Sequence, residues 1–185
     1  MSKNLISHLN KKDSTSPIYG IFDGVKYPML WSDLEDGVLE YDMLFREEEL
    51  RVELEEVAPY LVKLDFNSEL STENSSALMK CYGQNGCIFL TTSKLHFEKV
   101  LEVMREMFYI YTKEGEKGYM RFYDPVIFIK YIEQQDSNIL YALFNGIEHY
   151  WCEDVEDTNM LLHYSLDNGK VIKTALNLKK DSHES

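Results

Sequence analysis

The sequence has only three cysteines, Cys81, Cys87 and Cys152, and no two of them form a Cys-x-x-Cys pair. An odd number of cysteines without such a pair argues against a disulfide framework and is typical of a reducing compartment. A structural zinc site needs about four ligands. His149 and Cys152, three positions apart, supply two if they share a helix face. We therefore expect reduced thiols and neither a metal ion nor another cofactor.

Long apolar runs and basic residues are also scarce. No run approaches the roughly 20 residues that a membrane-spanning helix needs, and the N-terminus lacks the apolar core of a secretory signal. Lys and Arg number 19 against 32 Asp and Glu, so the formal net charge is -13. Nucleic acids and anionic membranes would repel such a chain. We expect a cytoplasmic protein that neither binds nucleic acid nor inserts into a membrane, and whose acidity serves solubility or a basic protein partner.

The common catalytic motifs are missing as well: there is no glycine-rich phosphate loop, no Gly-x-Ser-x-Gly elbow and no His-Glu-x-x-His pair. Two acidic clusters remain: Glu47, Glu48, Glu49, Glu53, Glu55 and Glu56, and then Glu153, Asp154, Glu156 and Asp157. Converging, desolvated carboxylates can act as acids or bases or hold a divalent cation. These carboxylates stand in runs among expected loop and edge residues, so both clusters are interpreted as solvated faces.

The sequence does contain strand-like and helix-like segments that alternate over the length of one domain. Residues 1–16 are expected to form a flexible N-terminal segment, 17–176 the folded domain and 177–185 a polar tail. Strands are expected at 17–25, 57–64, 86–93 and 117–124, and helices at 73–83, 94–111, 125–135 and 139–144. Asn168-Gly169, between two strand-like runs, predicts a C-terminal β-hairpin. The predicted fold class is a single α/β domain with a mixed β-sheet and helices packed on it.

Individual residues mark several boundaries of these segments. Asp23-Gly24 predicts a turn after the first strand. Pro59 cannot donate to a ladder and marks the start, edge or bulge of a strand. Gly83 is expected to close a helix, and Ser93 to cap the next one.

Two stretches are less regular. Residues 30–45 are interpreted as short helical turns with loops. In residues 46–56, Leu50, Val52 and Leu54 alternate with charged residues, which favours a strand. The content of Glu, Leu and Arg favours a helix, and both interpretations remain open.

The stretch 118–128, GYMRFYDPVIF, combines two signals. Asp124 is a favoured helix N-cap and Pro125 a favoured first helical residue, and an apolar run at helical spacing follows. If the preceding residues form a strand, Tyr119, Arg121 and Tyr123 share one face. Arg121 then has two possible roles. It either pairs with a carboxylate or an aromatic ring of its own chain, or it offers its guanidinium to a partner protein.

Several motifs, taken in order, resemble the effector-adaptor chaperones (Tap/TEC adaptors) of the bacterial type VI secretion system, which are encoded beside VgrG spike proteins. The resemblance runs from Ile18 to Leu166 and centres on MRFYDPVIF. Its other motifs are YGIFDG, VAPYLVKL, GCIFLTTSKLHFEKVLEVMREMF and FNGIEHYW. The motif residues are Asp23, Gly24, Pro59, Tyr60, Arg105, Asp124, Pro125 and Trp151. Many members continue into a helical second lobe, which this sequence does not show after the hairpin.

The resemblance implies a non-catalytic adaptor that binds a toxic effector in the cytoplasm and helps load it onto the VgrG spike. The expected partner-binding residues are Tyr119, Arg121 and Tyr123, because aromatic and arginine side chains are common in interface hot spots. One alternative is an immunity-type protein that binds a toxin in order to neutralise it. Another is an enzyme that uses Arg121 and Asp124.

Overall fold

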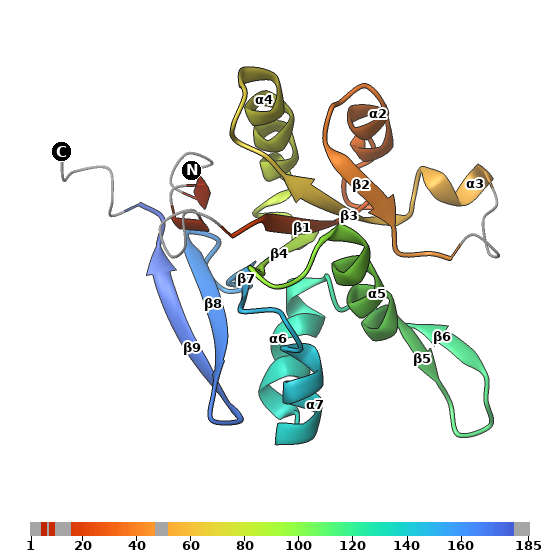
Figure 1. The fold of residues 1–185 in the computed structure, drawn as a ribbon, viewed down its shortest axis with the longest axis vertical. Coiled ribbons are helices and arrows are strands. Elements are labelled where there is room, and N and C mark those ends of the chain that lie inside the picture. Colours follow the sequence, from red (N-terminus) through yellow and green to blue (C-terminus); the bar gives the residue numbers. More distant parts are fainter. Residues whose placement is uncertain (1–4, 7, 10–15, 47–51, 180–185) are drawn as a thin grey trace.

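The computed structural model describes residues 5–6, 8–9, 16–46 and 52–179. Its main element is a seven-stranded sheet with the order β2-β3-β1-β4-β7-β8-β9 (Figure 1). The strands are β1 (Ile18–Asp23), β2 (Glu40–Met43), β3 (Pro59–Leu64), β4 (Cys87–Thr91), β7 (His149–Glu153), β8 (Met160–Asp167) and β9 (Lys170–Asn177). Two further strands, β5 (Tyr109–Tyr111) and β6 (Lys117–Tyr119), form a separate hairpin.

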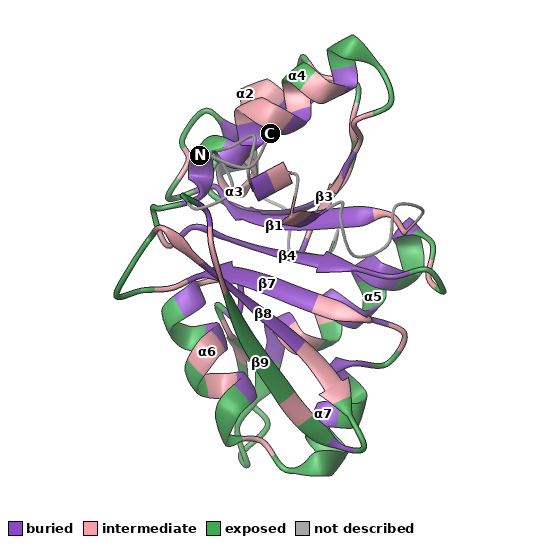
Figure 2. Ribbon diagram, turned by 90° about the vertical axis from the view of Figure 1, so that its left-hand side faces the viewer, coloured by how far each residue is buried: buried purple, intermediate pink, exposed green. Residues whose placement is uncertain are grey.

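Helices cover both faces of the sheet, as Figure 1 shows: α2 and α4 lie on one side, and α5, α6 and α7 on the other. The helices are α2 (Leu30–Glu35), α3 (Val52–Glu55), α4 (Glu69–Leu78), α5 (Phe97–Phe108), α6 (Pro125–Gln134) and α7 (Ser137–Leu143), with a 3-10 turn, η2 (Met79–Cys81). Every residue of β1 and β4 is buried (Figure 2). This two-sided burial explains why both strands are continuous apolar runs without alternation.

The structure confirms the predicted fold class, a single α/β domain with helices on a sheet and a C-terminal hairpin. One detail differs, because all described pairings of the sheet are antiparallel. A strand–helix–strand order suggested parallel neighbours. The chain does run β3–α4–β4, but β1 lies between these two strands and is antiparallel to both. The two strands that would form the parallel pair are therefore not adjacent.

The turn signals of the sequence are mostly confirmed. Asn168 and Gly169 have φ angles of 48° and 74° and join β8 to β9. Such left-handed conformations at both turn residues are typical of a type I′ hairpin. β3 begins at Pro59. Gly83 also has a positive φ, of 88°, but it follows η2, since α4 already ends at Leu78.

Two assignments in the first third of the chain need correction or completion. Residues 40–43 form β2, the strand at one edge of the sheet, and not helical turns. In the ambiguous stretch, residues 52–55 are helical, whereas 47–51 lie outside the described residues.

The predicted helix N-cap at Ser93 is wrong. α5 begins only at Phe97, and its N-cap residue His96 makes no side-chain capping bond. Thr92 instead organises the preceding turn, since its Oγ1 accepts from the amides of Lys94 and Leu95 at 3.1 Å each. The Ser93 hydroxyl bonds to the carboxylate of Glu148.

Described residues near both ends of the chain contact the folded core. Leu5 and Leu9, in the segment expected to be flexible, are buried in the core on the α2 and α4 side. At the other end β9 extends to Asn177, and the amide of the buried Leu178 donates to Asn159 O at 2.9 Å. In the described part of the chain, no helix has the length and apolar character needed to cross a membrane.

Candidate protein-binding surface

The chain leaves the strand conformation before Arg121. β6 ends at Tyr119, and the next residues form a turn in which the Phe122 amide donates to Met120 O at 2.8 Å. The predicted alternation of faces is therefore wrong. Phe122 and Tyr123 are both buried, whereas Tyr119 is exposed. Of the three expected partner-binding residues, Tyr119 and Arg121 lie at the surface and Tyr123 lies beneath it.

Arg121 pairs with a buried carboxylate at the end of β1. Its Nη2 lies 2.6 Å from Oδ2 of Asp23, whose side chain is 1% exposed. The other oxygen of Asp23 accepts from the Val25 amide at 3.0 Å. The Arg121 side chain remains 44% exposed, and its Cζ lies 6.0 Å from the Tyr123 ring centroid. Arg121 thus has the structural role that the sequence left open, and part of its side chain still reaches the surface.

Gly24 allows the backbone at this point to approach β3 closely. Its amide donates to Ala58 O at 3.1 Å. A Cβ at this position would lie only 2.6 Å from the same oxygen, so a larger residue would push the two backbones apart. The Asp23-Gly24 turn therefore fixes the carboxylate that receives Arg121.

Asp124 and Pro125 begin α6 as predicted. The Asp124 carboxylate accepts from the Val126 amide at 2.9 Å, and Pro125 occupies the first turn of the helix. The cap satisfies one of the amides that a helix N-terminus leaves without a partner. Asp124 is thereby engaged in a structural contact.

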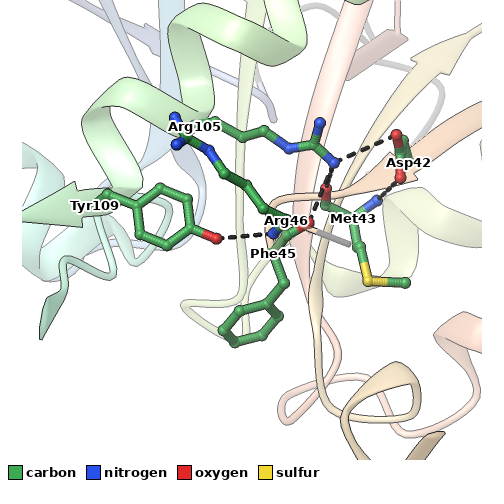
Figure 3. Close-up of polar contacts among 6 residues, drawn as sticks. All are labelled: Asp42, Met43, Phe45, Arg46, Arg105 and Tyr109. Carbon is green, nitrogen blue, oxygen red and sulfur yellow. Dashed lines mark hydrogen bonds and ion pairs between the residues drawn. The ribbon is translucent and has the colours of Figure 1, made fainter. Parts of the chain in front are cut away.

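Arg105, the motif arginine of α5, binds the end of β2 and the residues that follow it (Figure 3). Its Nη2 donates to Met43 O at 2.8 Å and to Phe45 O at 3.2 Å, and it lies 3.4 Å from Oδ2 of Asp42. The Arg46 amide extends this network by donating to the Tyr109 hydroxyl at 2.8 Å. One arginine and one tyrosine of the α5–β5 region thus hold the segment 42–46 against the helix.

Aromatic rings attach the β5–β6 hairpin to this network. Residues 109–119, which contain both strands, are called the hairpin arm. The Tyr119 ring stacks on Phe108 with a centroid distance of 5.1 Å, and Phe45 meets both rings edge-on at 5.2 and 5.3 Å. Lys117 Nζ lies 4.1 Å from the Tyr109 centroid, and Arg46 Cζ 5.0 Å. Such cation–aromatic contacts stabilise exposed sites by about 0.5–1 kcal/mol each.

The hairpin arm extends away from the body of the protein (Figure 1). It exposes Ile110, Tyr111 and Tyr119 by 47%, 64% and 48%. The sequence predicted a helix to residue 111, whereas α5 ends at Phe108 and β5 of the arm begins at Tyr109. The Glu114-Gly115 turn between two tyrosine-containing segments was the available signal, and Gly115 has a φ of 85°. The arm and Arg121 together form the candidate protein-binding surface.

The remaining motif residues belong to the interior. Tyr60 is buried, and its hydroxyl donates to Glu55 O at 2.9 Å. Trp151 is also buried, with the rings of His149 and His163 at 5.3 and 5.2 Å. These two motif residues are therefore packing residues of the fold.

The structure also corrects the placement of two candidate metal ligands. His149 and Cys152 lie on strand β7, where an odd spacing puts them on opposite faces, so they share no helix face. All three cysteines are buried free thiols, and burial raises the pKa of Cys81 to about 12. Within residues 5–6, 8–9, 16–46 and 52–179, no group of three or more His, Cys, Asp or Glu is placed to hold a metal ion.

One residue of the 153–157 acidic cluster departs from the expected solvated face. Glu153 is fully buried, and its Oε1 accepts from the Asn85 amide at 2.5 Å. Glu156 and Asp157 are exposed as expected. The prediction rested on the run of acidic residues, whereas β7 continues to Glu153 and buries its side chain. Glu47–Glu49 of the other cluster lie outside the described residues.

A family model described as a domain of unknown function (DUF4123) matches residues 18–139, more than half of the chain. No curated protein and no solved structure matches the sequence. The matched span begins at β1, contains the Asp23–Arg121 pair, Arg105 and the hairpin arm, and ends within α7, before Trp151. The chain therefore belongs to the family defined by this domain (DUF4123).

Proposed function

We propose that the protein is a non-catalytic cytoplasmic adaptor that binds a type VI secretion effector and helps load it onto a VgrG spike. The family supports this proposal, because it is associated with type VI secretion adaptors. The order of motifs from YGIFDG to FNGIEHYW supports it as well. The candidate surface gives the proposal a physical basis.

The hairpin arm is the observation that carries the proposal. Its strands have three residues each, and a short two-stranded hairpin adds little stability on its own. Ile110 and Tyr111 nevertheless stay largely outside the core. Exposed apolar and aromatic side chains that do not serve folding are typical of contact surfaces. A protein partner that covers the arm would bury them.

The state of the polar residues also favours a binding role over catalysis. The two residues that an enzyme would use here, Arg121 and Asp124, already hold Asp23 and the first turn of α6. A catalytic acid or base needs its proton-accepting atom free to reach a substrate. Arg121 keeps an exposed outer side, which suits a second hydrogen bond to a partner's carboxylate.

The proposal is tested in two steps. The tagged protein is purified from its native bacterium, and the copurified effector and spike proteins are identified and then reconstituted from purified components. The effector's toxic activity is next measured with the adaptor at saturating concentration. A stable complex in which the effector stays active supports the adaptor. Complete stoichiometric inhibition would instead indicate an immunity protein, and the lack of any complex would refute both functions.

A further inference from the structure

Glu153 is the one acid of the 153–157 cluster that the fold buries completely. It ends β7 and faces the loop of residues 82–86, which connects η2 to β4. Its Oε1 accepts from the Asn85 amide, while its Oε2 has no hydrogen-bond partner. A buried carboxylate oxygen without a donor is costly when the group is ionised.

Among the described residues, the electrostatic neighbours of Glu153 include no positive charge. The ionisable groups that act on it or respond to it are Cys81, Tyr82, Cys87, Cys152 and Asp124. They come from η2, the loop, β4, β7 and the start of α6, and none is a cation. Burial raises the pKa of Glu153 to about 7, although the amides of Asn85 and Gly83 lower it and Asp124 raises it further.

A second orphaned atom lies in the same loop. Asn85 has a φ of 52°, and its side-chain Oδ1 is buried without a partner. Glu153 Oε2 and Asn85 Oδ1 are thus both buried acceptors without a donor. They lie next to the hydrogen bond that the Asn85 amide donates to Glu153 Oε1. A proton on Glu153 adds a donor at this place and removes a buried negative charge.

The loop continues directly to the candidate surface. Gly86 O, next to Asn85, accepts from the Asp23 amide at 2.9 Å. Asp23 in turn holds Arg121 through its carboxylate. We propose that Glu153 is a proton-binding residue whose neutral form holds the loop 82–86 against the sheet, and whose ionisation loosens the support of the Asp23–Arg121 pair. Only the consequence for partner binding depends on the proposed function.

The direction of the pH effect follows from linkage. The unfolded chain releases the Glu153 proton near pH 4.5, whereas the folded protein keeps it up to about pH 7. Between these values the folded state binds more protons, so its stability falls as the pH rises and levels off above the folded pKa. The unfolding constant should increase by up to about tenfold per pH unit between pH 5 and 7 relative to a variant that lacks the titrating group.

The experiment measures both the proton site and its coupling to Asp23. Carbon-13 NMR of the wild-type protein should show the Glu153 carboxyl titrating near pH 7, and a midpoint below pH 5 would overturn the proposal without any substitution. Urea unfolding between pH 5 and 8 should show that the stability of Glu153→Gln no longer falls as the pH rises. The control Glu156→Gln, which changes an exposed neighbour, should follow the wild type. Parallel curves for the wild type and Glu153→Gln would contradict the proposal.

Hydrogen exchange tests the second half of the proposal, the coupling of Glu153 to the Asp23–Arg121 pair. Between pH 6 and 8 the protection of the Asp23 amide should decrease in the wild type and stay constant in Glu153→Gln. The Glu148 amide, which donates to Thr91 O at the opposite end of β4 and β7, serves as the internal control and should stay constant in both. Equal protection of the Asp23 amide in both proteins would refute the coupling. Because no step uses a partner, the outcome is independent of whether the effector complex exists.

Discussion

The guanidinium of Arg121 lies 2.6 Å from the buried carboxylate of Asp23, although the two residues are 98 positions apart in the chain. The contact joins the end of β1 to the turn that leads into α6. A buried carboxylate with a charged partner is stable, whereas the same carboxylate without that partner is strongly unfavourable. Arg121 therefore has a structural contact whether or not a partner binds.

We expect Arg121→Ala to lower the free energy of unfolding by about 2 kcal/mol, less than for a fully buried pair because the Arg121 side chain is partly exposed. In a protein that carries Asp23→Asn, the Arg121→Ala change should cost much less stability, because no buried charge is left to neutralise. Urea denaturation of the two single variants and the double variant gives their coupling energy, which should exceed about 1 kcal/mol. Additive effects would show that the pair contributes nothing to stability.

The N-cap of α6 gives a second prediction. Asp124→Ala should cost about 1 kcal/mol, because the Val126 amide loses its acceptor. Asp124→Asn should cost less, since asparagine also caps. Thermal unfolding measures both. If neither variant changes the melting midpoint and both weaken partner binding equally, Asp124 is a functional carboxylate and not a cap.

The contacts of Arg105 give the third prediction. Replacing it with Met keeps the apolar stem but removes the donors to Met43 O and Phe45 O. We expect a loss of about 1–3 kcal/mol, because two carbonyl groups lose a charged donor. Hydrogen exchange should also show faster opening of the segment 42–46. The control is Glu106→Gln, an exposed change on the same helix that should leave both measurements as they are.

Much of the fold could be predicted from local sequence. β1 and β4 are short apolar runs between turn residues, and Asp124-Pro125 and Asn168-Gly169 each fix a backbone conformation within two residues. Such signals need no knowledge of distant contacts. They predicted the elements at these places correctly.

The failures have tertiary causes. β2 is a strand because it pairs with β3, and its own sequence, EYDM, shows little periodicity. The order of the sheet depends on the insertion of β1 between β3 and β4, which no local pattern reveals. Arg121 was recognised as unusual, but its partner Asp23 is distant in the chain, and Glu153 was placed on the surface because its neighbours are acidic. The hairpin arm was missed because its first residues continue the helical periodicity of α5.

Tyr111 offers the sharpest test of the candidate surface, because it is exposed on the hairpin arm and takes part in no ring contact described for the arm. Tyr111→Ser should change stability by less than about 0.5 kcal/mol. If the partner covers the arm, the same change should weaken the complex at least about fivefold, which corresponds to a loss of about 1 kcal/mol. Calorimetric titration with the purified effector measures the affinity. The matched control is Tyr141→Ser on α7, a tyrosine that is 55% exposed outside the arm. Equal affinities for both variants and the wild type would place the effector contact elsewhere on the protein.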